Sequence, residues 1–402
     1  MPRERGYIIA AMAFLAISAS FLIGGYEFIR SSAISLFLDT FGAGYLPYGL
    51  AAMTLALVPC VYLYSILLSK IGGMRTLALT SLFSFACLIT LYFCILAKSK
   101  TAVFLLYIFH QIYILILVEQ YWSLTNSTLS SMEAKKYNGA IAGVAYIGPT
   151  VAGYVLYKYA QAVGTELMVL LAALSILPAV VLSLTAYKLA GEPQPSAGEK
   201  HGHKGHLHLS LIKTTPALCI IMSAVALAQV LSTVLEFNFS RMLGAKLPIM
   251  DERTSYLGGL WCIINGAAFV MQFIISPIVL KIFSVRTVCM IIPVINLVSQ
   301  CVCLFFPAMP VATASFGIFK CLDYSLFRTS KEILYIPLSY DARYRVKQVV
   351  DAFTNRFSKG ASAFVFSGLY AAGVSISASV YPMIGVVASA IWLKAASLLR
   401  KD

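Results

Sequence analysis

The sequence predicts an all-α membrane protein of about twelve transmembrane helices, arranged as two pseudo-symmetric six-helix bundles. Hydrophobic residues make up 60% of the 402-residue chain and charged residues only 11%, with a mean hydropathy of +0.84, which argues against a soluble domain. A short block also occurs twice: Lys70-Ile-Gly-Gly-Met-Arg75-Thr returns 211 positions later as Lys281-Ile-Phe-Ser-Val-Arg286-Thr. Because this offset is about half of the chain, it indicates a duplicated bundle.

The predicted spans are apolar stretches long enough to cross a bilayer, and they recur along the whole chain. In chain order they cover residues 7–27, 47–69, 76–97, 101–123, 139–160, 166–188, 214–236, 255–279, 285–306, 309–327, 349–371 and 375–396. The first is interpreted as a retained helix rather than a signal peptide, because no persuasive cleavage site follows it.

A hydrophilic stretch divides the chain into an N-terminal bundle at 1–190, a cytoplasmic linker at 191–212 and a C-terminal bundle at 213–402. The linker holds four of the five histidines: His201, His203, His206 and His208. We interpret it as a flexible connection, with metal sensing as the alternative, since no Cys or carboxylate is positioned to close a metal site. The nine cysteines lie in apolar runs without zinc-ligand spacing, so neither a resident metal nor a cofactor is expected.

The net charge of +14 follows the membrane topology rather than a nucleic-acid surface. Lys and Arg concentrate in alternate connections, on the side that holds both termini, and are sparse in the opposite connections. This positive-inside bias places both termini in the cytoplasm and predicts a multi-pass protein of the cell inner membrane. The expected partners are the lipid bilayer and a small anionic substrate, with no nucleic acid, and we expect a monomer.

Ionisable residues inside the spans mark the candidate site, because a charge in the bilayer is costly. They occur in both halves and in both signs: Glu27 and Arg30 at the end of the first helix, His110 and Glu119 in the fourth, Glu236 at the end of the seventh, Lys320 and Asp323 in the tenth, and Asp351, Arg356 and Lys359 in the eleventh. As a set they favour a polar pathway for an anionic solute. For each residue alone, a structural salt bridge between helices is the alternative.

His110 introduces a possible proton-coupling site, because an imidazole changes charge near neutral pH. Glu119, nine residues on, is its candidate partner on the same helix, although the spacing does not place the two on one face. A neutral histidine that hydrogen-bonds a neighbouring helix is the alternative. The repeated block supplies a candidate cytoplasmic gate, formed against carboxylates or helix C-termini by Lys70, Arg75, Lys281 and Arg286.

Two segments resemble signature loops of one transporter family. In the second half, Asp323-Tyr-Ser-Leu-Phe is followed by Lys331-Glu-Ile-Leu-Tyr-Ile-Pro-Leu and then by Lys347-Gln-Val-Val-Asp351. In the first half, Trp122-Ser-Leu-Thr-Asn is followed by Glu133-Ala-Lys-Lys-Tyr. These runs resemble the ATP/ADP translocases of plastids and intracellular bacteria, which implies nucleotide transport on a major-facilitator-like fold.

The resemblance implies substrate-binding roles for Glu236 and Lys347, which match family positions. Other family positions are altered, because Leu50 and Ala33 stand where the family has basic residues and His110 where it has an acid. Fewer cations weaken the case for a triphosphate, so a less charged nucleotide or an NAD-like molecule becomes a candidate.

The predicted function is alternating-access secondary transport of a nucleotide or nucleotide-like anion, by exchange or proton symport. Lys347, Arg30, Arg356 and Lys320 would bind the anion, and Glu236, Asp323 and Asp351 would pair with them in the unloaded states. An enzyme is not expected, since the sequence contains no P-loop, dinucleotide-binding glycine motif or nucleophile elbow. The alternatives are a carrier of a different solute on the same scaffold, or a non-transporting membrane receptor or accessory protein.

Overall fold

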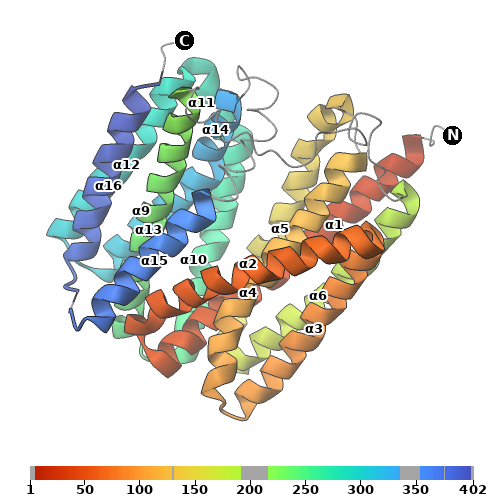
Figure 1. Ribbon diagram of the computed structural model, residues 1–402, viewed down its shortest axis with the longest axis horizontal. Coiled ribbons are helices and arrows are strands. Elements are labelled where there is room, and N and C mark those ends of the chain that lie inside the picture. Colours follow the sequence, from red (N-terminus) through yellow and green to blue (C-terminus); the bar gives the residue numbers. More distant parts are fainter. Residues whose placement is uncertain (1–4, 129–130, 192–215, 336–353, 375, 400–402) are drawn as a thin grey trace. The chain divides into compact units, whose positions relative to one another are not determined.

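The computed structural model describes residues 5–128, 131–191, 216–335, 354–374 and 376–399, and these are helical apart from short connections, with no strand among them (Figure 1). The first half forms α1 (Arg5–Phe41), α2 (Leu46–Ile71), α3 (Gly73–Leu96), α4 (Lys100–Thr128), α5 (Ser131–Val163) and α6 (Thr165–Ala190). The second half forms α9 (Pro216–Lys246), α10 (Met250–Val270), α11 (Ser276–Ile282), α12 (Val285–Phe305), α13 (Met309–Leu322), α14 (Arg328–Tyr335), α15 (Asn355–Ala371) and α16 (Val380–Ser397).

Two helix pairs of the second half are joined through single π-helical turns. Met271–Ile275 connects α10 to α11, and Asp323–Phe327 connects α13 to α14. With each pair counted once, the helices follow the order of the twelve predicted stretches. Nine of the described helical segments are long and apolar enough to cross a membrane. The chain is therefore an all-α, multi-pass membrane protein, as predicted.

Two predicted helix ends were wrong. The first helix runs on to Phe41 and the seventh to Lys246, so Glu27, Arg30 and Glu236 lie inside helices rather than at their ends. An apolar window stops at the first charges, but the helix does not, because backbone groups within a membrane must stay hydrogen-bonded. The charged side chains are accommodated by burial against partners from other helices.

The chain divides into two compact units, and each is described by itself. Unit 1 comprises Met1–Gly42, Leu55–His201 and Leu247–Gly266, and unit 2 comprises Ala43–Thr54, Gly202–Lys246 and Ala267–Asp402. The start of α2 thus groups with unit 2, and most of α10 groups with unit 1. The bundle boundaries drawn from the linker remain a prediction.

In unit 1, α1 is the central helix and packs against α4, α5 and α6. Small residues allow close approach: a Cβ on Gly148 of α5 would collide with the backbone of Ser20 in α1. Where α1 packs against α6, the Ser18 hydroxyl donates to the Ala179 carbonyl oxygen of α6 at 2.7 Å. Packing of this kind, with few large side chains between backbones, is typical of membrane helices.

The N-terminal part of α10 is held against three helices of unit 1. The Arg253 guanidinium lies 2.9 Å from the Asp39 carboxylate of α1, and the Ser255 hydroxyl donates to the Tyr157 carbonyl oxygen of α5 at 2.6 Å. At α6, the Asp251 carboxylate accepts from the Thr165 backbone N–H at 2.8 Å. Because the residue before α6 is Gly164, which has no side chain to cap the helix, Asp251 supplies the N-cap from another helix.

In unit 2, α9 packs against α13, α15 and α16, and α12 packs against α13 and α16 (Figure 1). Aromatic contacts fill these interfaces, for example Phe239 stacked on Phe316 at 5.0 Å between ring centroids. The start of α2 reaches α15 at Gly360, where a Cβ would collide with the Thr54 side chain.

Candidate functional site

In unit 1, the candidate site is built around a buried charge pair on α1, Glu27 and Arg30. Together with their neighbours we call it the α1 cluster: Tyr26, Glu27, Arg30, Trp261 and Asn265. Glu27 is 1% exposed and forms a salt bridge with Arg30, three residues along the same helix face. The Asn265 amide of α10 donates to the same carboxylate oxygen at 3.1 Å. The predicted Glu27–Arg30 contact is therefore present, and α10 contributes to it.

The Arg30 guanidinium is also held by aromatic rings. Its central carbon lies 3.2 Å from the ring centroid of Trp261 and 5.1 Å from that of Tyr26. A guanidinium over an aromatic face is stabilised electrostatically, and more so when water is excluded. Arg30 is thus positioned by one carboxylate and two rings inside the membrane-spanning part of unit 1.

His110 of α4 borders the α1 cluster, and Glu119 does not. The His110 ring is 1% exposed, stacks on Tyr26 at 6.1 Å, and has Nδ1 3.3 Å from the Leu106 carbonyl oxygen. Glu119 is exposed on another face of α4. The structure therefore does not bring the two predicted proton-coupling residues together.

In unit 2, the candidate site is a second buried group, the α9 cluster: Ser232, Glu236, Lys320, Asp323 and Lys359. The Lys359 ammonium of α15 lies 3.1 Å from the Glu236 carboxylate, and both side chains are only 15% exposed. The Lys320 ammonium of α13 donates to the Ser232 hydroxyl of α9 at 3.0 Å. Three helices therefore place a carboxylate and two ammonium groups in the interior of the unit.

Asp323, within the α9 cluster, and Arg356, beside it, add two further charges. Asp323 opens the π turn after α13 and interacts electrostatically with Lys320, Arg328 and Lys331. Arg356 lies on α15, one turn before Lys359, and interacts with it electrostatically. A π turn inside a helix is frequent at functional sites, because it changes the direction of the side chains that follow.

Lys347 and Asp351, two predicted substrate-binding residues, lie outside the described residues. Leu50 and Ala33, which stand where the resemblance leads one to expect cations, are both fully buried.

The residues of the predicted cytoplasmic gate lie at the two helix junctions, as the repeat predicted. Lys70 lies in the last turn of α2 and Arg75 in the first turn of α3, while Lys281 lies in the last turn of α11 and Arg286 in the first turn of α12. Lys70, Arg75 and Lys281 are exposed. Arg286 donates to the carbonyl oxygen of Ser397, the last residue of α16, at 2.6 Å.

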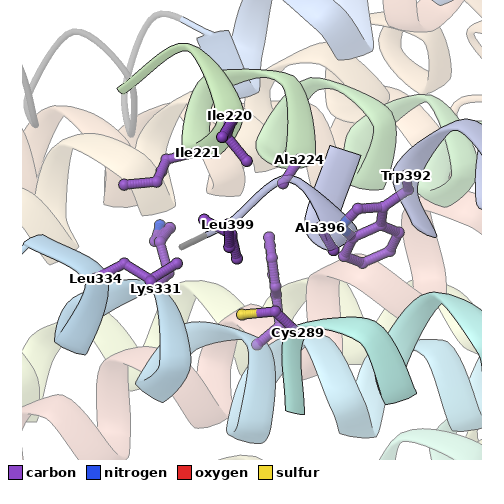
Figure 2. Close-up of a pocket in the computed structure, with 10 residues that line it drawn as sticks. Ile220, Ile221, Ala224, Cys289, Lys331, Leu334, Trp392, Ala396 and Leu399 are labelled. Atoms are coloured by element: carbon purple, nitrogen blue, oxygen red, sulfur yellow. The ribbon is translucent and has the colours of Figure 1, made fainter. Parts of the chain in front are cut away.

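A small pocket in unit 2 lies near the α11–α12 junction (Figure 2). It is lined by apolar residues of α9, α12 and α16, among them Ile220, Cys289 and Trp392, with Lys331 of α14 at its side. The lining carries one charged group and no carboxylate, so it offers no pair of ionisable partners like those of the two clusters.

Trp261, Asn265 and Ser232 were missed by sequence reasoning. None is ionisable, and each comes from a helix far along the chain from its charged partner. The sequence did contain a pattern that points to Arg241 as a counterpart of Arg30. At the repeat offset of 211 residues, Phe28-Ile-Arg30 corresponds to Phe239-Ser-Arg241. Arg241 donates to the Ile376 carbonyl oxygen at 3.3 Å and lies 5.9 Å from the Tyr381 ring, so it joins α9 to the segment before α16.

The model of the TLC ATP/ADP transporter family matches residues 263–402. The chain resembles this family. ADP,ATP carrier protein 1 of Chlamydia muridarum is 25% identical over 237 residues, which are 52% of this chain and 42% of that protein. The protein of the same name from Chlamydia pneumoniae is 22% identical over 236 residues, which are 52% of this chain and 46% of that protein. The chain thus spans less than half the length of these curated relatives. The resemblance predicted from the two signature loops is confirmed.

Solved transporter structures share the fold over nearly the whole chain. The nucleoside transporter NupG has a TM-score of 0.65 at 13% identity and covers 97% of each chain. An autoinhibited peptide transporter of the POT family has a TM-score of 0.71 at 10% identity, covering 98% of each chain. A bacterial homologue of the iron transporter ferroportin, in an inward-facing state, has a TM-score of 0.69 at 11% identity, covering 97% of this chain and 99% of its own. These neighbours confirm the major-facilitator-like fold, and because they are named as transporters of different solutes, the fold leaves the solute open.

Proposed function

We propose that the chain is a secondary transporter of a nucleotide or nucleotide-like anion, working by alternating access in the cell inner membrane with both termini in the cytoplasm. The observation that carries this proposal is the presence, in each unit, of charged side chains buried within membrane-spanning helices. Such residues are expensive in a bilayer and are typical of solute and ion pathways. The names of the Chlamydia relatives, which are ADP,ATP carriers, support a nucleotide as the solute.

In this proposal the anion is bound by cations that are paired with carboxylates when no solute is present. In unit 1, Arg30 leaves its salt bridge with Glu27 and binds the anion instead. In unit 2, Lys320, Arg356 and Lys347 bind it, and Glu236, Asp323 and Asp351 pair with these cations in the unloaded states. Lys359, which holds Glu236 in the structure, joins this set. Because a charge-assisted bond in low dielectric is strong, exchange of partners avoids leaving any of these charges isolated.

The junction residues would form the cytoplasmic gate of this transporter. Arg286 already bonds the C-terminal carbonyl of α16, where the helix dipole favours a cation. Lys70, Arg75 and Lys281 are proposed to make similar contacts in the state that is closed to the cytoplasm. The transporter is proposed to act as a monomer.

A carrier of a different anion on the same scaffold is the second candidate, and a specific observation favours it. Leu50 and Ala33 are buried apolar residues in place of two family cations, so fewer positive charges are available for a polyphosphate. A receptor without transport activity would not need the buried charges to be functional.

The test is uptake of labelled ATP, ADP and NAD into intact cells that express the protein, with and without a proton-gradient uncoupler. We expect saturable uptake of one of them, lost in Lys347→Ala and Lys320→Met and retained in Lys98→Ala. Lys98 is the matched control because its side chain is 83% exposed. Absence of uptake of all three from a well-inserted protein would favour another anion. Uptake that survives neutralisation of Lys320 and Lys347 would contradict the assigned site.

A further inference from the structure

Glu27 holds a buried negative charge that depends on one cation. One carboxylate oxygen accepts from both Arg30 and Asn265, while the other, Oε1, is buried and has no hydrogen-bond partner among the described residues. If Arg30 left, the carboxylate would keep only one neutral donor. An isolated charge in the membrane interior is far more costly than a paired one. Departure of Arg30 therefore requires that Glu27 lose its charge.

The Arg30 guanidinium contacts Glu27 and the Trp261 ring at the same time. Its central carbon lies 3.2 Å from the Trp261 ring centroid while the guanidinium forms the salt bridge with Glu27. Trp261 and Asn265 are four residues apart on α10 and so lie on one face of that helix. The same face of α10 thus contacts both members of the charge pair.

We propose that Glu27 is a proton-binding site whose protonation releases Arg30 to bind the substrate anion. This inference rests on the transport function proposed above. The proton comes from solution and forms an O–H bond on the Glu27 carboxylate, while the salt bridge to Arg30 is broken. The cluster carries no net charge with Glu27 ionised and Arg30 paired, and again none with Glu27 protonated and Arg30 bound to one negative charge. Proton and anion therefore enter together, as in a symporter.

Among the described residues, the other titratable groups at this site are Tyr26 of the cluster itself, His110 and Tyr113 of α4, which interact with Tyr26, and Cys262 of α10, which interacts with Glu27. Phenol and thiol groups are neutral at the pH of the cytoplasm in reference peptides, so they do not compete for the proton there. Histidine does titrate near neutral pH. His110 is therefore the rival that an experiment must separate from Glu27.

The test uses Trp261 as the reporter. The chain has three tryptophans, so Trp122→Phe with Trp392→Phe leaves Trp261 alone. Its emission is measured against pH in the purified full-length protein, without substrate. Because movement of the Arg30 cation on protonation changes the surroundings of the Trp261 ring, we expect a one-proton transition that disappears in Glu27→Gln. The transition should persist in His110→Gln and in the exposed-site control Glu119→Gln.

A second variant covers the case in which Glu27→Gln fails to fold. Asn265→Ala removes a donor that stabilises the charged carboxylate, so the midpoint of the transition should move to higher pH by about one unit. NAD, whose charge does not change near neutral pH, should also move the midpoint to higher pH. By linkage, an anion that binds Arg30 only when Glu27 is protonated favours the protonated form. A transition that persists in Glu27→Gln, that is lost in His110→Gln, or that is unmoved by Asn265→Ala would overturn the inference. Because the titration needs no substrate, it stands or falls separately from the uptake assay.

Discussion

At the scale of single residues, the charges in the membrane-spanning helices are stabilised by specific partners. The i, i+3 spacing of Glu27 and Arg30 was enough to predict their contact, since both lie on one helix. The spacing did not predict Trp261 or Asn265, because these neutral residues come from α10, more than 200 positions further along the chain. Sequence patterns reveal which residues are costly to bury, but a partner from another helix is determined by packing.

The Glu236–Lys359 pair allows a direct measurement of what burial does to a salt bridge. Lys359→Met leaves the Glu236 carboxylate buried without its ammonium, so we expect the free energy of unfolding in detergent to fall by about 3 kcal/mol. Adding Glu236→Gln to this variant should recover most of the loss, because the carboxylate that lost this ammonium is then neutral.

The matched control is an exposed pair in the same chain. Lys98 and Glu166 lie 3.6 Å apart, but the lysine side chain is 83% exposed. Lys98→Met should change the free energy of unfolding by about 0.5 kcal/mol or less. Equal effects at the two lysines would show that Lys359 does not contribute through a buried pair.

At the scale of the helices, their order and approximate place in the described parts of the chain were predictable from the sequence, and their interruptions were not. The predicted stretch 309–327 is interrupted by the π turn at Asp323–Phe327, and the stretch 255–279 by the turn at Met271–Ile275. A π turn inserts one residue into a helix without changing its hydrophobicity, so no apolar window reports it. Helix ends were missed for a related reason, since buried ion pairs lower the local hydropathy without ending the helix.

The contact between α5 and α10 depends on glycine at one position of α10 and not at another. A Cβ at Gly258 would lie 2.8 Å from the Tyr157 backbone nitrogen and 2.9 Å from the Gly153 carbonyl oxygen, whereas a Cβ at Gly266 would meet nothing within 4 Å. We therefore expect Gly258→Ala to lower the free energy of unfolding by about 2 kcal/mol through overpacking. Gly266→Ala should be neutral or stabilising by up to about 1 kcal/mol, because alanine favours the helix. Thermal unfolding of the two variants side by side tests this, and similar losses in both would contradict it.

At the scale of the whole molecule, composition was sufficient to predict an all-α membrane fold, and the duplication indicated by the repeated block stays a prediction. Bilayer thickness and backbone hydrogen bonding leave few alternatives for a chain this apolar. The division of the helices between the two compact units was harder to predict. The start of α2 packs in unit 2 and most of α10 in unit 1, and nothing in the hydropathy of either helix indicates this.

The repeat also makes a prediction about membrane orientation. If the two copies of the block are related by an axis along the membrane normal, the α2–α3 and α11–α12 junctions face the same side. In a cysteine-free background, Ser69→Cys and Ser284→Cys should be protected in intact cells from a membrane-impermeant thiol reagent. Ala97→Cys and Ala372→Cys, in exposed connections on the opposite side of the predicted topology, should react. Labelling of one block position and not the other would contradict parallel repeats.

The cap that Asp251 of α10 places on α6 has a consequence for local dynamics. The Thr165 amide proton is satisfied by a carboxylate from another helix and not by a residue of its own turn. Whenever α10 separates from α6, that proton loses its acceptor and becomes available for exchange with deuterium from solvent. The exchange rate at this one amide would then report how often α10 separates from α6. A transported solute that alters this frequency would change the rate without contacting Thr165.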